Sequence, residues 1–225
     1  LQPPKVGTDF CNAIPFLPIS FFKTHKVMCR DFIPEYIFES SGTTQSSTSR
    51  HFVKTGAIYR QSFFIAFEMF YGDIKDWCII GLLPSYLERK NSSLVLMVDE
   101  LIKASGHSES SFYLDDFERL NQTLQLLESR KQKTLLIGVT FALLDFSEQY
   151  PVQLEHTTLM ETGGMKGRRS ELTREQVHTF LCTQLGLKTV HSEYGMTELL
   201  SQAYSKGGGK FLCPPWMKVL VRDEE

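Results

Sequence analysis

The chain has no apolar run long enough to cross a membrane and no recognisable secretory leader. Its charge imbalance is small, a formal net charge of −2, which argues against a nucleic-acid partner held by bulk electrostatics. It lacks a Cys-x-x-Cys pair, so zinc binding and a disulfide framework are poorly supported, and a reducing cytoplasm is the expected compartment. The five cysteines stand far apart, at Cys11, Cys29, Cys78, Cys182 and Cys213.

The 225 residues are 42% hydrophobic and 22% charged, values typical of a globular protein. Strand-like and helix-like segments alternate, which predicts an α/β fold with a parallel or mixed β-sheet flanked by helices. We expect strands at 36–38, 77–83, 134–139, 157–160 and 217–221, and another ending at Val190. We expect helices at 58–71, 92–104, 115–130, 141–149 and 173–185.

The ends of the chain suggest a piece of a longer protein, because it starts at Leu1 and stops at Glu225 just after a strand-like run. Residues 1–34 are rich in proline and aromatic side chains. We expect them to form an extended segment that packs on the domain, with a short helix near residues 21–26.

The stretch from Glu161 to Arg169 holds three glycines and three cations within a few residues. Glycines let the backbone approach a ligand closely or adopt a positive φ. The cations Lys166, Arg168 and Arg169 favour a ligand that is anionic. The alternative is an ordinary solvated turn.

A second stretch, from His191 to Glu198, combines two carboxylates, an aromatic ring, a glycine and a hydroxyl. Tyr194 offers a ring for stacking, Thr197 a hydroxyl for hydrogen bonding, and Glu198 a carboxylate for a cation. Both stretches follow strand-like runs, and ligands of parallel sheets bind where strands end at their carboxyl side. We therefore expect these two stretches to face one site, together with a third loop at residues 40–44.

A Ser/Thr/Gly-rich segment, residues 39–50, follows the strand-like Tyr36-Ile-Phe38. Backbone N–H groups and hydroxyl donors at the end of a strand suit a phosphate. The segment is not a Walker A loop, because the Gly-Lys-Ser/Thr ending is absent. A disordered polar linker is an equal alternative.

Two of these motifs resemble the adenylate-forming (acyl-CoA synthetase-like) enzymes. Ser40-Ser-Gly-Thr-Thr44 is similar to their phosphate-binding motif, and Tyr194-Gly-Met-Thr-Glu198 is similar to their Tyr-Gly-x-Thr-Glu motif. More narrowly, the segments 161–168, 193–205 and Pro214-Pro-Trp-Met217 resemble the acyl-protein synthetase branch, which activates fatty acids in bacterial bioluminescence systems. The resemblance covers most of the chain and implies the large N-terminal domain of such an enzyme, without its C-terminal lid domain.

The resemblance implies an AMP-forming ligase that activates a carboxylic acid, in this branch a fatty acid, with ATP and Mg²⁺. The acid attacks the α-phosphate and gives an acyl-adenylate and pyrophosphate, after which the acyl group passes to a thiol of a protein, a carrier or coenzyme A. The implied contacts to the β- and γ-phosphates are Ser41, Gly42, Thr43 and Thr44. The implied contacts to the rest of the nucleotide are Gly163, Gly164, Tyr194 and Gly195.

Three residues receive catalytic roles from the same resemblance. Thr197 would hydrogen-bond the α-phosphate or the substrate carboxylate. Glu198 would bind Mg²⁺, a hard cation that prefers carboxylate oxygen. Lys166 would supply a cation to the phosphates, because the family's Gly-x-Pro-Lys continuation is absent from the phosphate loop and Gln45-Ser-Ser stands there.

The family's ribose-binding aspartate, catalytic lysine and acyl-accepting cysteine would lie beyond Glu225. We therefore expect these 225 residues alone to bind ATP weakly and to turn over little or nothing. A catalytically incomplete nucleotide- or acyl-binding module is the main alternative.

Several single residues have weaker functional interpretations. Gly106-His-Ser-Glu-Ser110 resembles a nucleophile elbow only in part, since Ser110 replaces the final glycine. His178 is expected on the surface of its helix, and His191 either borders the site or packs beneath it. Cys213 is expected to be a small buried residue, with an acyl-accepting thiol as the alternative.

Overall fold

The computed structural model describes residues 16–40, 48–84, 91–163 and 172–221. The strands are β1 (Tyr36–Glu39), β2 (Arg50–Val53), β3 (Cys78–Leu82), β4 (Ser111–Phe112), β5 (Thr134–Gly138), β6 (Thr157–Glu161), β7 (His191–Tyr194) and β8 (Ala203–Ser205). The helices are α1 (Phe21–Thr24), α2 (Ala57–Tyr71), the 3₁₀ turn η2 (Ile74–Asp76), α3 (Ser93–Ser105), α4 (Phe117–Ser129), α5 (Thr140–Gln149) and α6 (Arg174–Leu185).

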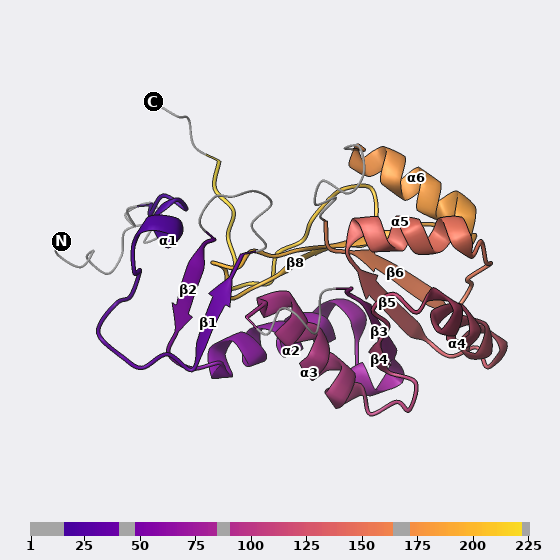
Figure 1. The fold of residues 1–225 in the computed structure, drawn as a ribbon, viewed down its shortest axis with the longest axis horizontal. Coiled ribbons are helices and arrows are strands. Elements are labelled where there is room, and N and C mark those ends of the chain that lie inside the picture. Colours follow the sequence, from indigo (N-terminus) through magenta and orange to yellow (C-terminus); the bar gives the residue numbers. More distant parts are fainter. Residues whose placement is uncertain (1–15, 41–47, 85–90, 164–171, 222–225) are drawn as a thin grey trace.

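Six strands form one mixed sheet in the order β4-β3-β5-β6-β7-β8. All neighbouring pairs are parallel except β7 and β8, which are antiparallel. Helices α5 and α6 lie over one face of the sheet, and α2 and α3 lie over the other (Figure 1). The expected α/β class, with helices flanking a mostly parallel sheet, is confirmed.

The strand order places a reversal between β3 and β5. The chain leaves β3 outward to the edge strand β4, then returns past β3 to β5 and continues through β6 and β7 in the opposite direction. In open α/β sheets, ligands bind outside the carboxyl ends of the strands near such a reversal. The loops after β3, β5, β6 and β7 therefore share the edge where a ligand is expected.

Buried apolar strands account for the centre of the sheet. Every residue of β3 and of β5 is buried, as expected for strands covered by helices on both faces. On the α2 side, Tyr71 and Phe70 pack against Tyr204 of β8, with ring centroids 5.5 and 5.3 Å apart. In the described ranges, no helix is long and apolar enough to span a membrane.

Helix α6 has the ends that its sequence predicts. The Thr173 hydroxyl accepts from the backbone N–H of Gln176, and the Gln176 side chain accepts from the backbone N–H of Thr173, which completes a capping box. The helix ends at Gly186, whose φ of 64° is left-handed. This helix follows the segment that carries the first candidate motif, so the capping box defines where the backbone resumes a regular structure after that motif.

Some expected elements differ from the structure. The expected strand at 217–221 is wrong, because that segment is irregular and Val221 is almost fully exposed. The strand expected to end at Val190 instead begins at His191, so half of the second candidate motif is strand rather than loop. The short strands β2, β4 and β8 were not expected from the sequence.

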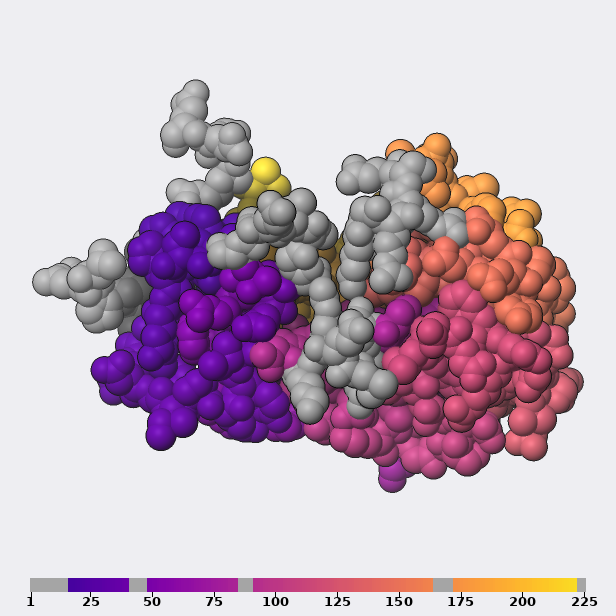
Figure 2. Space-filling model, in the orientation of Figure 1, coloured from indigo at the N-terminus to yellow at the C-terminus, as the bar shows by residue number. Residues whose placement is uncertain are grey.

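Strands β1 and β2 form a separate antiparallel hairpin outside the main sheet. Helix α1 lies against it, with the Phe22 ring 5.6 Å from His51 and the Lys26 amine 5.7 Å from the Phe52 ring. Figure 2 shows this N-terminal part in indigo at one end of an elongated molecule and the β3–α6 part in magenta to orange at the other. Several apolar side chains of residues 16–33 remain exposed on it.

Candidate functional site

Strands β6 and β7 end side by side at the carboxyl edge of the sheet. Glu161, the last residue of β6, is paired in register with Ser192 of β7. The segments that follow, Thr162–Gly163 and Gly195–Glu198, therefore leave neighbouring strands at the same edge. This edge holds the candidate residues Gly163, Tyr194, Gly195, Thr197 and Glu198. The candidates Ser41, Gly42, Thr43, Thr44, Gly164 and Lys166 lie outside the described residues.

The β1–β2 hairpin reaches the same loop through His51. Its Nδ1 lies 3.1 Å from the backbone oxygen of Thr197, 146 residues away. Burial lowers the pKa of His51, against smaller opposing effects of the Thr197 carbonyl and Glu198. The ring is then neutral near pH 7, and its Nδ1–H donates to the carbonyl. At the neck of the hairpin, Ser40 and Ser49 exchange two hydrogen bonds of 3.1 and 2.9 Å.

Replacing His51 with phenylalanine is expected to lower the free energy of unfolding by about 1 kcal/mol. The new ring keeps the contact with Phe22 but has no donor for the Thr197 carbonyl. Chemical denaturation at pH 7 measures the change. His25→Phe, which removes an exposed hydrogen bond with its neighbour Thr24, is the control and should change little. Equal losses in both variants would contradict the coupling between hairpin and loop.

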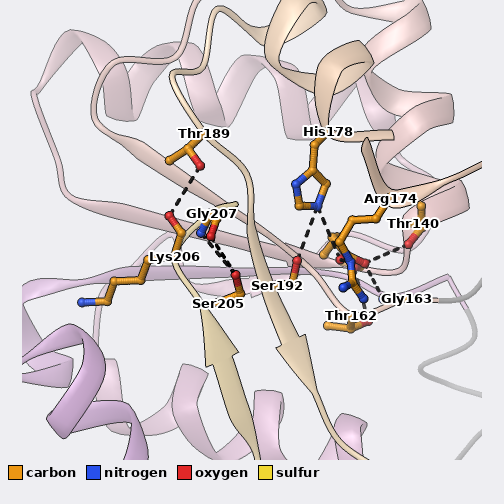
Figure 3. A network of polar contacts seen from close by, with 12 residues as sticks. Thr140, Thr162, Gly163, Arg174, His178, Thr189, Ser192, Ser205, Lys206 and Gly207 are labelled. Atoms are coloured by element: carbon orange, nitrogen blue, oxygen red, sulfur yellow. Dashed lines mark hydrogen bonds and ion pairs between the residues drawn. The ribbon is translucent and has the colours of Figure 1, made fainter. Parts of the chain in front are cut away.

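Glu161 is the centre of a buried polar network, and Figure 3 labels four of its partners, Thr140, Gly163, Arg174 and His178. The residue is 4% exposed, and its Oε2 accepts from the Gly163 N–H at 2.7 Å and from the Thr140 hydroxyl at 3.1 Å. Its Oε1 lies 3.5 Å from Arg174 Nε and 3.6 Å from His178 Nε2. The carboxylate thus joins β6 to the starts of α5 and α6.

Burial alone would raise the pKa of Glu161, because it disfavours the charged form. Interactions with His178, Ser192, the Gly163 amide and Thr140 outweigh burial and hold the pKa at about 2. Glu161 is therefore ionised at neutral pH and places one fixed negative charge under the edge of the sheet.

Gly163 has the features of a close-approach glycine. Its φ is 75°, a left-handed value that favours glycine, and, chain neighbours aside, no atom of the described residues lies within 4 Å of where a Cβ would stand. Its N–H is used by Glu161, and its carbonyl accepts from Thr140 N at 3.2 Å. The backbone polar groups are already paired, so the open side of Gly163 suits a flat apolar surface better than a phosphate.

Tyr194 presents an accessible ring at the end of β7. It is 41% exposed, and its hydroxyl donates to the Met196 sulfur at 3.1 Å. Phe211 supports the ring edge-on, with centroids 6.1 Å apart. Gly195 follows directly, and a Cβ there would stand 2.5 Å from Glu193 Oε1. A side chain at position 195 would therefore force the Glu193 carboxyl to shift.

Glu198 is the half-buried carboxylate of this loop. In the part of the chain that the structure describes, no three carboxylate, imidazole or thiol groups come together as a metal site. Mg²⁺ commonly binds through one or two carboxylates plus substrate phosphates and water. A single carboxylate such as Glu198 is therefore enough for a magnesium ion that arrives with a nucleotide.

The sequence analysis missed the partners of Glu161. His178 was expected on the surface, but its side chain is 15% exposed and its Nε2 lies 3.4 Å from the Ser192 hydroxyl, so that expectation is wrong. Arg174 and His178 are four residues apart in α6 and share one face. This spacing, directly after a capping box, is the sequence signal that could have indicated that both side chains reach one partner. His191 packs beneath the edge, with Nδ1 3.2 Å from the Tyr71 hydroxyl.

Two hollows lie beside these elements, and the larger is lined in part by Arg174 and His178, the partners of Glu161. One, of about 520 Å³, lies between the starts of β6 and β7, where Thr157, Thr158 and Thr189 line it. The other, of about 780 Å³, runs along α6 toward the turn at Gly208 and Gly209. Neither hollow is lined by Tyr194 or Glu198, so their volumes do not identify the candidate nucleotide site. Lys188 and Thr189 line both hollows, and the Thr189 hydroxyl donates to the Lys206 carbonyl (Figure 3).

The residues with weaker functional interpretations lie elsewhere in the fold. The segment from Gly106 to Ser110 joins α3 to the start of β4, so it is at the amino edge, opposite the candidate site. There the Ser110 hydroxyl accepts from Ile79 N at 2.8 Å. The described cysteines are free thiols, with Cys78 buried and Cys213 half-buried.

Comparisons of the chain with protein-family models, with curated proteins and with solved structures find no match.

Proposed function

We propose that this chain binds ATP with Mg²⁺ at the carboxyl edge of its sheet, as the nucleotide-binding part of an enzyme that activates a carboxylic acid as an acyl-adenylate. The acyl group then passes to a thiol acceptor on a protein or carrier, in the cytoplasm. The observation that carries the proposal is the meeting of two motif-bearing segments at one edge. The Glu161–Gly163 and Tyr194–Glu198 segments leave neighbouring strands, and His51 ties the hairpin that bears the third motif to Thr197.

The chemistry of the edge supports each part of this assignment. Tyr194 offers an exposed ring and Gly163 an open backbone, which suit the two faces of an adenine. Thr197 and Glu198 stand beside them with a hydroxyl and a carboxylate. ATP with magnesium needs donors for phosphate oxygens and a carboxylate for the ion, because transfer at phosphorus is mostly charge stabilisation and alignment. The segment 41–44, which would contact the phosphates, lies outside the described residues.

Titration calorimetry of the protein with ATP, in magnesium and then in EDTA, tests the nucleotide site. We expect magnesium-dependent binding of ATP and no comparable binding of adenosine, which has no phosphates. Absence of ATP binding would overturn the proposal. Exchange of labelled pyrophosphate into ATP by the full-length protein, dependent on added fatty acid, then separates an enzyme from the alternative nucleotide-binding module, which would bind without exchange.

A further inference from the structure

Glu193 lies on the opposite face of β7 from the Glu161 network. It is 8% exposed and pairs across the sheet with Tyr204 of β8. On the same side, the Gln202 amide donates to the Tyr59 hydroxyl at 3.0 Å, and that hydroxyl donates to the Ser93 carbonyl at 3.1 Å. We refer to Glu193, Tyr59, Tyr71, Gln202 and Tyr204 as the β7 core cluster.

Two polar atoms of this cluster have no partner in the described structure. They are Gln202 Oε1 and the Tyr204 hydroxyl, and both are buried. A buried polar atom without a hydrogen bond costs about 1–3 kcal/mol, so such atoms mark a place where another group is expected. Gln202 Oε1 can only accept, and a neutral carboxyl brings one O–H donor.

The Glu193 carboxyl also lies directly beneath the candidate loop. A Cβ at Gly195 would stand 2.5 Å from Glu193 Oε1 and 3.8 Å from Gln202 Cγ. The space that a side chain would occupy at Gly195 is therefore filled by the Glu193 carboxyl, with Gln202 beside it. The first residue of the loop rests on the cluster.

We propose that Glu193, with its carboxyl neutral, is the positioning residue of loop 195–198, and that its ionisation at alkaline pH loosens this loop. The carboxyl acts through the loop and does not contact the nucleotide. The inference rests on the proposed function only where ATP binding is the readout, because the order of the loop is measurable without ligand.

The surroundings of Glu193 favour the neutral form. Burial, and then the negative charge of Glu161, raise its pKa to about 8. The titratable groups that act on it or share its face are Tyr59 and Tyr71 of α2, Tyr204 of β8, Glu161 of β6 and His191 of β7. The same environment raises the pKa of Tyr59, Tyr71 and Tyr204, and burial lowers that of His191 to about 4, so these groups stay uncharged near neutrality.

The direction of the pH effect follows from the raised pKa. Between its ordinary value of 4.5 and about 8, the folded protein binds a proton at Glu193 that the unfolded chain releases. The stabilisation is complete below pH 4.5 and is lost as the pH rises through about 8. The loop that rests on the carboxyl should therefore lose order above pH 8.

Amide hydrogen exchange of residues 196–200, without ligand and corrected for intrinsic rates, tests this between pH 7 and pH 9.5. In the wild-type protein we expect protection to fall about tenfold relative to α4 amides. In Glu193→Gln, whose amide cannot ionise, protection should not fall with pH. In Glu193→Ala it should be low throughout. Glu68→Gln, on the exposed side of α2, should follow the wild type.

Equal pH dependence in the wild type and in Glu193→Gln would overturn the inference. If Glu193→Gln does not fold, the wild type decides, because constant loop protection from pH 7 to 9.5 would also overturn it. ATP affinity should weaken over the same range in the wild type only. Loss of loop protection with no ATP binding at any pH would refute the proposed function and leave the role of Glu193 standing.

Discussion

Replacing Glu161 with glutamine is expected to lower the free energy of unfolding at pH 7 by about 3 kcal/mol. The neutral amide keeps the shape of the side chain but removes the charge that faces Arg174 and His178. The NH₂ of the amide then faces donors in either orientation, the Thr140 hydroxyl and Gly163 N–H on one side or Arg174 and His178 on the other. Urea denaturation of both proteins measures the difference.

The pH dependence of this difference identifies its cause. The pKa of Glu161 is lowered from 4.5 to about 2, so its stabilisation is complete above pH 4.5 and is lost as the pH falls through about 2. The gap between wild type and Glu161→Gln should shrink over that interval. Glu155→Gln, an exposed carboxylate just before β6, is the control. Equal unfolding midpoints at pH 7 would refute the network as a stabilising element.

Magnesium is expected to increase the affinity of the wild-type protein for ATP. Replacing Glu198 with glutamine should reduce this increase by about tenfold to a hundredfold. The carboxylate is the magnesium ligand of the proposed site, and an amide oxygen carries no charge for a hard cation. Affinity for ATP in EDTA should change little, since Tyr194 and Gly163 remain in place. Calorimetry with and without magnesium gives both values.

The same substitution should also abolish most pyrophosphate exchange where the wild-type protein shows it. Far-UV circular dichroism and the unfolding midpoint confirm that Glu198→Gln is folded, and Glu109→Gln at the amino edge serves as the matched control. An undiminished effect of magnesium in Glu198→Gln would remove Glu198 from the metal site, whatever the affinity for ATP itself.

The central elements of the fold were predictable because their signals are local. Strands β3 and β5 are continuous apolar runs, and α6 carries both a capping box and a terminal glycine. Strand β2 was missed because its four residues, Arg50–Val53, show no apolar run, and their pairing with β1 is not visible in the sequence. The prediction for segment 217–221 was wrong in the opposite sense, because its apolar run forms no strand. The residue that bridges to Tyr204 of β8 is Leu212.

The candidate site was predictable in its position but not in its internal order. The strands expected at 157–160 and up to Val190 placed both motifs directly after strands, although β7 in fact runs from His191 to Tyr194. The alternation within β7 was not anticipated, and it sends Ser192 and Glu193 to opposite faces of the sheet. The buried carboxyl group of Glu161 is therefore ionised, whereas that of Glu193 is neutral. The difference comes from hydrogen-bond partners such as His178, which lie far along the chain.

The placement of α2 has a consequence for the order in which the protein forms during synthesis. This helix precedes every strand of the main sheet in the sequence, yet it covers the last two strands. The Tyr59 hydroxyl accepts a hydrogen bond from Gln202, and the Ser62 hydroxyl accepts one from the Trp216 indole, 154 residues later in the chain. Contacts of such separation form late and slow the folding of a chain. On the ribosome, α2 and the hairpin before it must remain without these partners until the end of the domain emerges. The proposed binding edge would then be assembled last, so a truncated nascent chain would carry its motifs without the site.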